Sequence, residues 1–290
     1  MRLDESIEWI TPDGLRLCAA VAGTPLHLVD VRGIDGLEQE IYTVKGTGQA
    51  GVSVQGTSLA EREIEVDLSI ARNGVPHRAA LLRAFRPCGE PGTFVFRRGA
   101  DAWHISAYVQ QAPRFSAGLL TPSTLVLLCP APAMLKGDAD VSSTVDIAAW
   151  LDDIEFAFEI PEEGHELSHR APQLIVNAVN EGDMASGCVI EFRASGSCAD
   201  PVLINAVTQE RLSLRVDLAA GDVLTVNTYY GRKRVMLLRD GVQTNVFNAL
   251  EAGSTWLQMA PGDNFLRYDA GRNVENLDCT IRFNAAFSGV

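Results

Sequence analysis

Apolar and polar residues alternate with a period of two along much of the chain, which is typical of strands that bury one face. The clearest run covers residues 64–70, where Ile, Val and Leu alternate with Glu, Asp and Ser. The same pattern recurs over residues 103–109, 211–218 and 281–285. Each segment is a predicted strand with one face toward a core and one toward water. The fold class that we expect is therefore mainly β.

One segment has a helical pattern instead. Residues 76–85 are rich in Ala, Leu and Arg, and Leu81, Leu82 and Phe85 fall on one face of a helix. The proline at the start of this segment is tolerated in a first helical turn, and Pro87 ends the helix. We predict a single clear helix.

The border between two domains falls near residues 130–155, where prolines, a glycine and the start of an acidic run gather. Within this region, residues 143–151 are a weaker helix candidate that could equally be linker. A chain of 290 residues is long enough for two domains. We predict an N-terminal α+β domain over residues 1–138, with one helix packed on β-sheets, and a C-terminal β-sandwich domain over residues 139–290.

The charge of the chain argues against a nucleic-acid-binding surface. The net charge is −13, whereas affinity for phosphates comes from clustered Lys and Arg. The acid is concentrated between Gly137 and His169, where ten Asp or Glu occur without any Lys or Arg. Such a run indicates a solvated stretch or a domain border.

No segment is predicted to span a membrane. The most apolar stretch, residues 119–135, contains three prolines and falls short of the ~20 residues that a spanning helix needs. The first six residues include two acids where a signal peptide needs a basic region. We expect a protein that is made and kept in the cytoplasm until assembly. Its six cysteines form no Cys-x-x-Cys pair and are expected to be buried free thiols.

The segment His165-Glu166-Leu167-Ser168-His169 matches the H-E-x-x-H motif of zinc proteases, in which two His on one helical turn bind Zn²⁺. Pro161 and Gly164 precede the motif and Pro172 follows it, so its context opposes a helix. Strand-like sequence over residues 174–179 comes next. We predict a polar loop that enters a strand, and no metal site.

Residues 46–51, Gly-Thr-Gly-Gln-Ala-Gly, formally match the G-x-G-x-x-G dinucleotide motif. A dinucleotide site needs a helix directly after this loop, but residues 52–56 are strand-like. A glycine-rich hairpin or loop is the better account, because Gly lets the backbone turn without side-chain clash. The chain contains no credible catalytic constellation, so we expect no enzymatic activity and no cofactor.

The C-terminal half carries a series of phrases in a fixed order. They are Asn180-Glu181-Gly182-Asp183, residues 188–196, Asp200-Pro201, residues 218–228 and residues 254–264, in which Pro261-Gly262 predicts a type II turn. This order resembles the siphophage distal tail proteins. Residues 59–68, the predicted helix and the strand that ends near Pro113 resemble the same family, so the resemblance extends from about Ile41 onward.

The resemblance implies a structural virion protein of a phage or prophage tail tip, or baseplate. It implies that N-terminal domains form a homo-hexameric ring at the distal end of the tail, with a galectin-like C-terminal sandwich on the outside. The implied partners are the tail tube protein, the tail-associated hub protein, the tape measure protein and the receptor-binding components of the host-attachment apparatus. Neither direct nucleic-acid binding nor membrane contact is implied.

A glycine-rich extension over residues 42–56 is our candidate for the ring interface, because it could reach a neighbouring subunit and pair there. The predicted interface residues are Tyr42, Val44, Gly46, Gly48, Gly51, Val52 and Val54. The valines would supply apolar contact and the glycines a close turn. An acidic ring lumen that repels DNA and simple solubility explain the net charge equally well.

A carbohydrate-binding module is the alternative function. A galectin-like sandwich can bind sugar, and five aromatic residues could stack on pyranose rings: Trp150, Trp256, Tyr229, Tyr230 and Tyr268. Aromatic residues in a sandwich more often fill the core or an edge.

Overall fold

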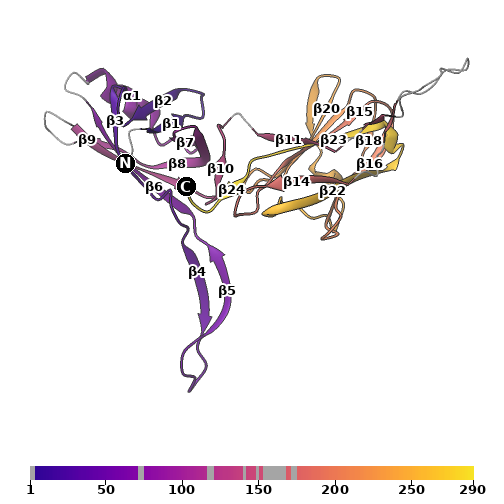
Figure 1. The fold of residues 1–290 in the computed structure, drawn as a ribbon, viewed down its shortest axis with the longest axis horizontal. Helices are drawn as coiled ribbons and strands as arrows, with labels where there is room; N and C mark the ends of the chain where they lie inside the picture. The colour runs from indigo at the N-terminus through magenta and orange to yellow at the C-terminus, as the bar shows by residue number, and fades with distance from the viewer. Residues whose placement is uncertain are drawn as a thin grey trace, which may run out of the picture. The chain divides into compact units, whose positions relative to one another are not determined.

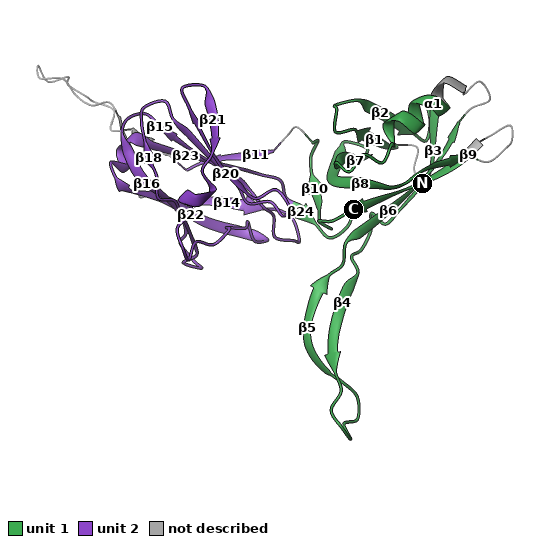
Figure 2. Cartoon of the chain, turned by 180° about the vertical axis from the view of Figure 1, so that it is seen from behind, with its two compact units in different colours: residues 1–141, 286–290 green, residues 142–285 purple. Residues whose placement is uncertain are grey.

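The computed structural model describes residues 4–70, 75–115, 121–139, 142–147, 150–152, 168–170 and 175–290. The chain forms two compact units, which Figure 2 shows in different colours. Unit 1 comprises residues 1–141 and 286–290, and unit 2 comprises residues 142–285. The fold is mainly β, as predicted, and the described residues contain a single α-helix.

Unit 1 is built on a nine-stranded sheet with the order β24-β10-β8-β7-β1-β2-β3-β6-β9. Its strands are β1 (Glu5–Ile10), β2 (Arg16–Ala20), β3 (Leu26–Arg32), β6 (Arg62–Ile70), β7 (Gly92–Arg98), β8 (Asp101–Phe115), β9 (Thr121–Cys129), β10 (Met134–Lys136) and β24 (Ala286–Phe287). An additional pairing of β8 with β9 closes the path from β8 through β7, β1, β2, β3 and β6 into a barrel. Neighbouring strands are antiparallel except β2 and β3.

The predicted helix is confirmed as α1 (Val75–Ala84). Leu81 and Phe85 are buried in the core of unit 1, whereas Leu82 is 43% exposed. The indole of Trp9 stacks on Phe85 with ring centroids 5.3 Å apart, and its Nε1 donates to the Ala84 carbonyl at 2.9 Å. The helix end is therefore fixed to strand β1 by both an aromatic contact and a hydrogen bond.

Arg62, the first residue of β6, donates to four backbone carbonyl oxygens and is 4% exposed. Its Nε lies 2.7 Å from Pro132 O, its Nη1 2.5 Å from Gly33 O, and its Nη2 2.5 Å from Ser288 O. A longer contact of 3.3 Å joins Nη1 to Asp35 O. Burial lowers the pKa of the guanidinium. One buried cation thus joins three separate stretches of unit 1 to the start of β6.

Unit 2 contains two antiparallel sheets that enclose one core. The first has the order β11 (Ser143–Asp146), β23 (Leu277–Phe283), β15 (Val189–Ala194), β19 (Val223–Asn227), β20 (Arg234–Arg239) and β21 (Val242–Asn245). The second has the order β14 (Val176–Asn180), β22 (Gly262–Arg272), β16 (Cys198–Asn205) and β17 (Arg211–Ser213), and β18 (Asp217–Leu218) also pairs with β16. A separate pair is formed by β12 (Trp150–Asp152) and β13 (Ser168–Arg170), and two 3-10 turns are η1 (Phe247–Ala249) and η2 (Val274–Asn276).

The core of unit 2 takes side chains from both sheets. Phe192 and Phe283 of the first sheet lie in the same buried cluster as Leu203, Leu266 and Tyr268 of the second. Two sheets that share one core form a β-sandwich, which Figure 1 shows on the side of the yellow and orange strands. Whether this sandwich is galectin-like stays a prediction.

Three details of the sequence analysis are corrected by the structure. The helix candidate at residues 143–151 is wrong, because residues 143–146 form strand β11, whose Val145 pairs with Ile281. The single strand predicted over residues 211–218 is divided into β17 and β18, both paired with β16. Residues 286–290, which the predicted boundaries assign to the C-terminal domain, belong to unit 1.

The cysteines also differ in part from the prediction. All six are free, but only Cys129, Cys188, Cys198 and Cys279 are buried, and Cys18 and Cys88 are exposed. Burial raises the pKa of Cys129 to about 12 and that of Cys188 to about 11. The buried thiols therefore stay protonated at neutral pH and behave as small apolar side chains.

An ion pair in unit 2 joins the buried carboxylate of Asp222 to the exposed guanidinium of Arg239. Asp222 is 2% exposed and accepts from Arg239 Nε at 3.0 Å and Nη2 at 2.5 Å. It also accepts from the Ala219 backbone N–H at 2.8 Å. The hydrogen bond from Arg239 lowers the pKa of the Asp222 carboxyl.

We expect Asp222→Ala to lower the free energy of unfolding by about 1.5–3 kcal/mol at pH 7, the usual range for a hydrogen bond to a charged group. Because the folded-state pKa lies below the unfolded one, the stabilisation is present at neutral pH. It is lost as the pH falls below about 4 and through the folded-state pKa. Denaturant unfolding of the unsubstituted chain and of Asp222→Ala measures this at pH 7 and near pH 3. The difference between their free energies of unfolding should be smaller near pH 3. An equal difference at the two pH values would contradict this assignment. The control is Glu251→Ala, which removes the half-buried partner of the exposed Arg215 and should lower the free energy of unfolding less.

We also expect residues 142–285, expressed alone, to fold as one cooperative unit. The reason is that its two sheets enclose a core of their own. Thermal unfolding followed by circular dichroism tests this. A fragment without a cooperative transition would show that the two units do not fold separately.

Candidate assembly interface

Strands β4 (Gln39–Val44) and β5 (Ser53–Leu59) form an antiparallel hairpin that pairs with no other described strand. Figures 1 and 2 show that it projects from the sheet of unit 1. Every residue of β4 is exposed. An isolated two-stranded hairpin is only marginally stable in water. The hairpin therefore gains stability when a partner covers it.

Gly46, Gly48 and Gly51 form the turn at the tip of the hairpin. The Gly46 N–H donates to Gln49 Oε1 at 2.9 Å, and the Gln49 N–H donates to the Gly46 carbonyl at 3.1 Å. Gly48 and Gly51 have φ values of 76° and 84°, which side-chain-bearing residues rarely adopt. The G-x-G-x-x-G match is thus the turn of a hairpin, and strand β5 occupies the place where a dinucleotide site needs a helix.

The two faces of the hairpin differ in chemistry. The register pairs Gln39 with Leu59, Ile41 with Thr57 and Thr43 with Val54, which places these side chains on one face. Alternation along the chain puts Val52 on the same face as Val54. The exposed fractions of the four apolar side chains on this face are 57% for Ile41, 55% for Val52, 61% for Val54 and 47% for Leu59. We call Ile41, Val52, Val54 and Leu59 the aliphatic face.

The opposite face is more polar. Tyr42 lies opposite Gly56, and its hydroxyl donates to Glu40 Oε2 at 2.7 Å and lies 3.0 Å from Ser58 Oγ. Val44 is the other apolar residue there and is 55% exposed. A bulge between Tyr42 and Thr43 shifts the register in the middle of the hairpin, which increases its local twist.

The structure brings all seven predicted interface residues into this hairpin but divides them among three places. Val52 and Val54 lie on the aliphatic face, Tyr42 and Val44 on the opposite face, and the three glycines in the tip region. Ile41 and Leu59 of the aliphatic face are not among the predicted residues. Both lie outside the glycine-rich segment, and the extra residue that the bulge places in β5 breaks the alternation between Val54 and Leu59.

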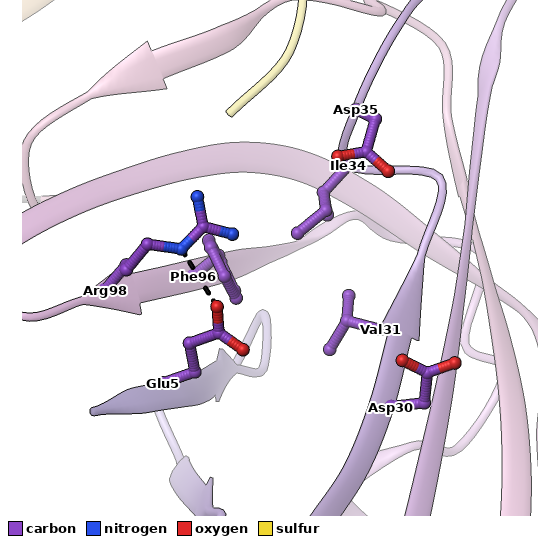
Figure 3. A pocket seen from close by; sticks show the side chains of 7 residues that line it. All are labelled: Glu5, Asp30, Val31, Ile34, Asp35, Phe96 and Arg98. Atoms are coloured by element: carbon purple, nitrogen blue, oxygen red, sulfur yellow. Dashed lines mark hydrogen bonds and ion pairs between the residues drawn. The ribbon is translucent and has the colours of Figure 1, made fainter. Parts of the chain in front are cut away.

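A pocket of about 250 Å³ lies in unit 1 near the start of the hairpin. Its lining side chains, shown in Figure 3, are Glu5, Asp30, Val31, Ile34, Asp35, Phe96 and Arg98. Arg98 Nε pairs with Glu5 Oε1 at 2.9 Å, and its guanidinium lies over the Phe96 ring. The ionisable side chains of the lining are three carboxylates and one guanidinium, and the guanidinium is paired with the Glu5 carboxylate.

The zinc-protease motif lies mostly outside the described residues, which do not include His165 or Glu166. Ser168 and His169 belong to strand β13, which pairs with β12. The last two residues of the motif are therefore in a strand, whereas a zinc-protease site needs the whole motif in a helix. Within the described residues, no group of His, Cys, Asp and Glu could hold a metal ion.

The aromatic residues of the carbohydrate hypothesis differ in their burial and contacts. Tyr268 is 2% exposed and belongs to the core. The Tyr229 hydroxyl accepts from the Asn284 N–H at 3.2 Å, and burial raises its pKa. Trp256 contacts Phe247 and Lys233. Tyr230 is 73% exposed, while the side chain of Trp150 lies outside the described residues.

Two phrases that carry the family resemblance hold turns together. The Asn180 side chain donates to the carbonyls of Met184 and Met259 at 2.8 and 2.9 Å. The buried Asn264 donates to Ala178 O at 3.1 Å and accepts from the Ala260 N–H at 2.9 Å. Gly262, with φ of 83°, has the positive φ that the third position of a type II turn needs. Both asparagine side chains thus bind backbone groups and stabilise the local fold.

No helix in the described part of the chain has the length and apolarity needed to cross a membrane. A search of the curated proteins finds no match.

Comparison with known families and structures gives two kinds of similarity. Residues 181–287 match the family model described as the siphovirus-type tail component, C-terminal domain. The whole chain resembles the crystal structure of the SPP1 Dit (gp 19.1) protein, described as a paradigm of the hub adsorption apparatus in phages that infect Gram-positive bacteria. The TM-score is 0.65 at 16% identity, over 98% of this chain and 99% of that one. It also resembles a chain of the phage P2 baseplate in its activated conformation with Ca, with a TM-score of 0.56 at 8% identity over 99% of both chains.

Proposed function

We propose that this chain, whose residues 181–287 form a siphovirus-type tail component domain, is the subunit of a hexameric ring at the distal end of a siphophage tail. The resemblance to distal tail proteins found in the sequence is confirmed by the family match and by the fold. A structural role in a phage tail or baseplate follows. The ring, its six-fold closure and its partners are the proposal.

The exposed aliphatic face of the hairpin carries this proposal. Four apolar side chains are about half exposed on a hairpin that pairs with no other described strand. Fully burying an exposed aliphatic side chain of this size contributes about 1.5–3 kcal/mol, so each of these half-exposed side chains gains roughly half of that before the entropy cost of association. The hairpin therefore gains stability by burying this face in a second copy of the chain. A contact between the hairpin of one copy and a different surface of the next is head to tail, and such contacts form a ring when the rotation from copy to copy closes on itself.

The proposed ring links the tail tube protein on one side to the tail-associated hub protein on the other. The tape measure protein and the receptor-binding components are further proposed partners within the virion. The proposed role is architectural and non-enzymatic, and it is supported by the similarity to tail-component and baseplate proteins.

We expect the double substitution Ile41→Asp and Val54→Asp to weaken self-association at least about 100-fold, because it places two charges on a surface that becomes buried. The matched control is Ser53→Asp with Ser58→Asp, which adds the same charge to the opposite face. Sedimentation equilibrium gives the association constants. Unchanged unfolding midpoints would show that neither variant disturbs the barrel. Equal loss of association in both double variants would contradict the assignment to the aliphatic face.

We expect negative-stain images of the purified chain at high concentration to show six-fold rings. Mass photometry of the same sample should give the mass of six subunits. A protein that stays monomeric at high concentration, even with its tail tube protein present, would contradict the ring.

A further inference from the structure

We propose that residues 286–290, here called the return segment, hold the root of the β4–β5 hairpin and thereby control whether the hairpin is presented for assembly. The inference rests on the proposed role of the hairpin as the ring interface. It is carried by contacts that the return segment makes within unit 1.

The return segment is bound to unit 1 along its length. Its first two residues form β24, in which Phe287 pairs with Met134 and Ala286 with Leu135 of β10. The Ser288 carbonyl accepts from Arg62 at 2.5 Å. The Val290 N–H donates to the Ile34 carbonyl at 3.0 Å, and the Val290 side chain packs against the barrel core.

Gly289 lies so close to the chain at Asp35 that no side chain fits between them. A Cβ on Gly289 would lie 2.0 Å from the Asp35 carbonyl oxygen and 2.4 Å from its carbonyl carbon. Since both contacts are to backbone, they cannot be relieved by a side-chain rotation. Glycine at this position is therefore a condition for the return segment to reach its place.

The residues that receive the return segment are those that connect the barrel to the hairpin. Residues 33–38 join β3 to β4, and residues 60–61 join β5 to β6. The Ala60 N–H donates to the Glu38 carbonyl at 3.1 Å and closes the hairpin root. Arg62 follows directly and binds the Gly33 carbonyl of the root together with the Ser288 carbonyl of the return segment. The guanidinium of Arg62 thus donates both to the root of the hairpin and to the return segment.

Loss of the return segment removes contacts from both sides of the root. Arg62 loses one acceptor, and the Ile34 carbonyl loses the Val290 N–H. The hairpin has no other paired strand among the described elements to fix its direction. Because the return segment follows unit 2 in the sequence, the root becomes fixed only after unit 2 has been synthesised. The arrangement restricts ring entry to chains that already carry both units.

The test compares the 290-residue chain with Gly289→Ala and with a chain that ends at residue 285. Hydrogen exchange is measured at a concentration where all are monomeric, and self-association is measured separately by mass photometry. In both variants we expect exchange of the amides over residues 33–41 and 58–62 to accelerate at least about tenfold, since contacts to a charged group are lost. Strands β1 and β7 should keep their protection in Gly289→Ala. A synthetic peptide of residues 284–290 should restore slow exchange to the shortened chain.

The matched control is Gly36→Ala, in the same connection, where an added Cβ has no atom within 4 Å. It should leave both exchange and association unchanged. Slow exchange at the root in Gly289→Ala, or acceleration spread evenly over the whole barrel, would overturn the inference. The exchange measurement does not require a ring. A chain that never associates would defeat the proposed function, while the exchange result would still decide the role of the return segment.

Discussion

The buried guanidinium of Arg62 is the interaction on which the architecture of unit 1 depends. A guanidinium in a place that is 4% exposed must have its donors paired, because an unpaired buried charge is costly. Its partners are backbone carbonyls from the connection after β3, the connection after β9 and the return segment. Lys could not replace Arg62 here. Arg offers several donors in one rigid plane, which can bind several carbonyls, whereas Lys offers a single point charge. The cost of burying the charge is offset only when all three stretches are in place.

This arrangement links two features that would otherwise be unrelated. The barrel closes through β8 and β9, so its strands have a core of their own, while the hairpin β4–β5 leaves the sheet without a partner strand. A closed sheet can carry such an extension because its own strands do not depend on it. The extension then needs a firm root, which Arg62 and the return segment supply. The exposed aliphatic face and the anchored root fit one purpose, the presentation of an apolar surface to another copy of the chain.

The fold class, the helix and the location of the hairpin could be predicted from the sequence, because each depends on a local residue pattern. The alternation over residues 64–70 became part of β6, and the prolines and alanines around residues 76–85 defined α1. Closure of the barrel could not be predicted, since it depends on the pairing of β8 with β9 across a register that shifts twice. The role of Arg62 was equally hidden. It stands in the sequence as one basic residue among acids, and its partners are backbone atoms up to 226 positions away. Ile41 and Leu59 were missed because the predicted interface was centred on the glycines near the tip.

The proposed ring depends on burial of the aliphatic face of the hairpin by a second copy of the chain. The most direct measurement is a cryo-electron microscopy reconstruction of the assembled oligomer at a resolution that shows side chains. We predict that Ile41, Val52, Val54 and Leu59, each about half exposed in the single chain, lie in contact with the neighbouring subunit. A ring in which the hairpin points into solvent, with its aliphatic face uncovered, would contradict it.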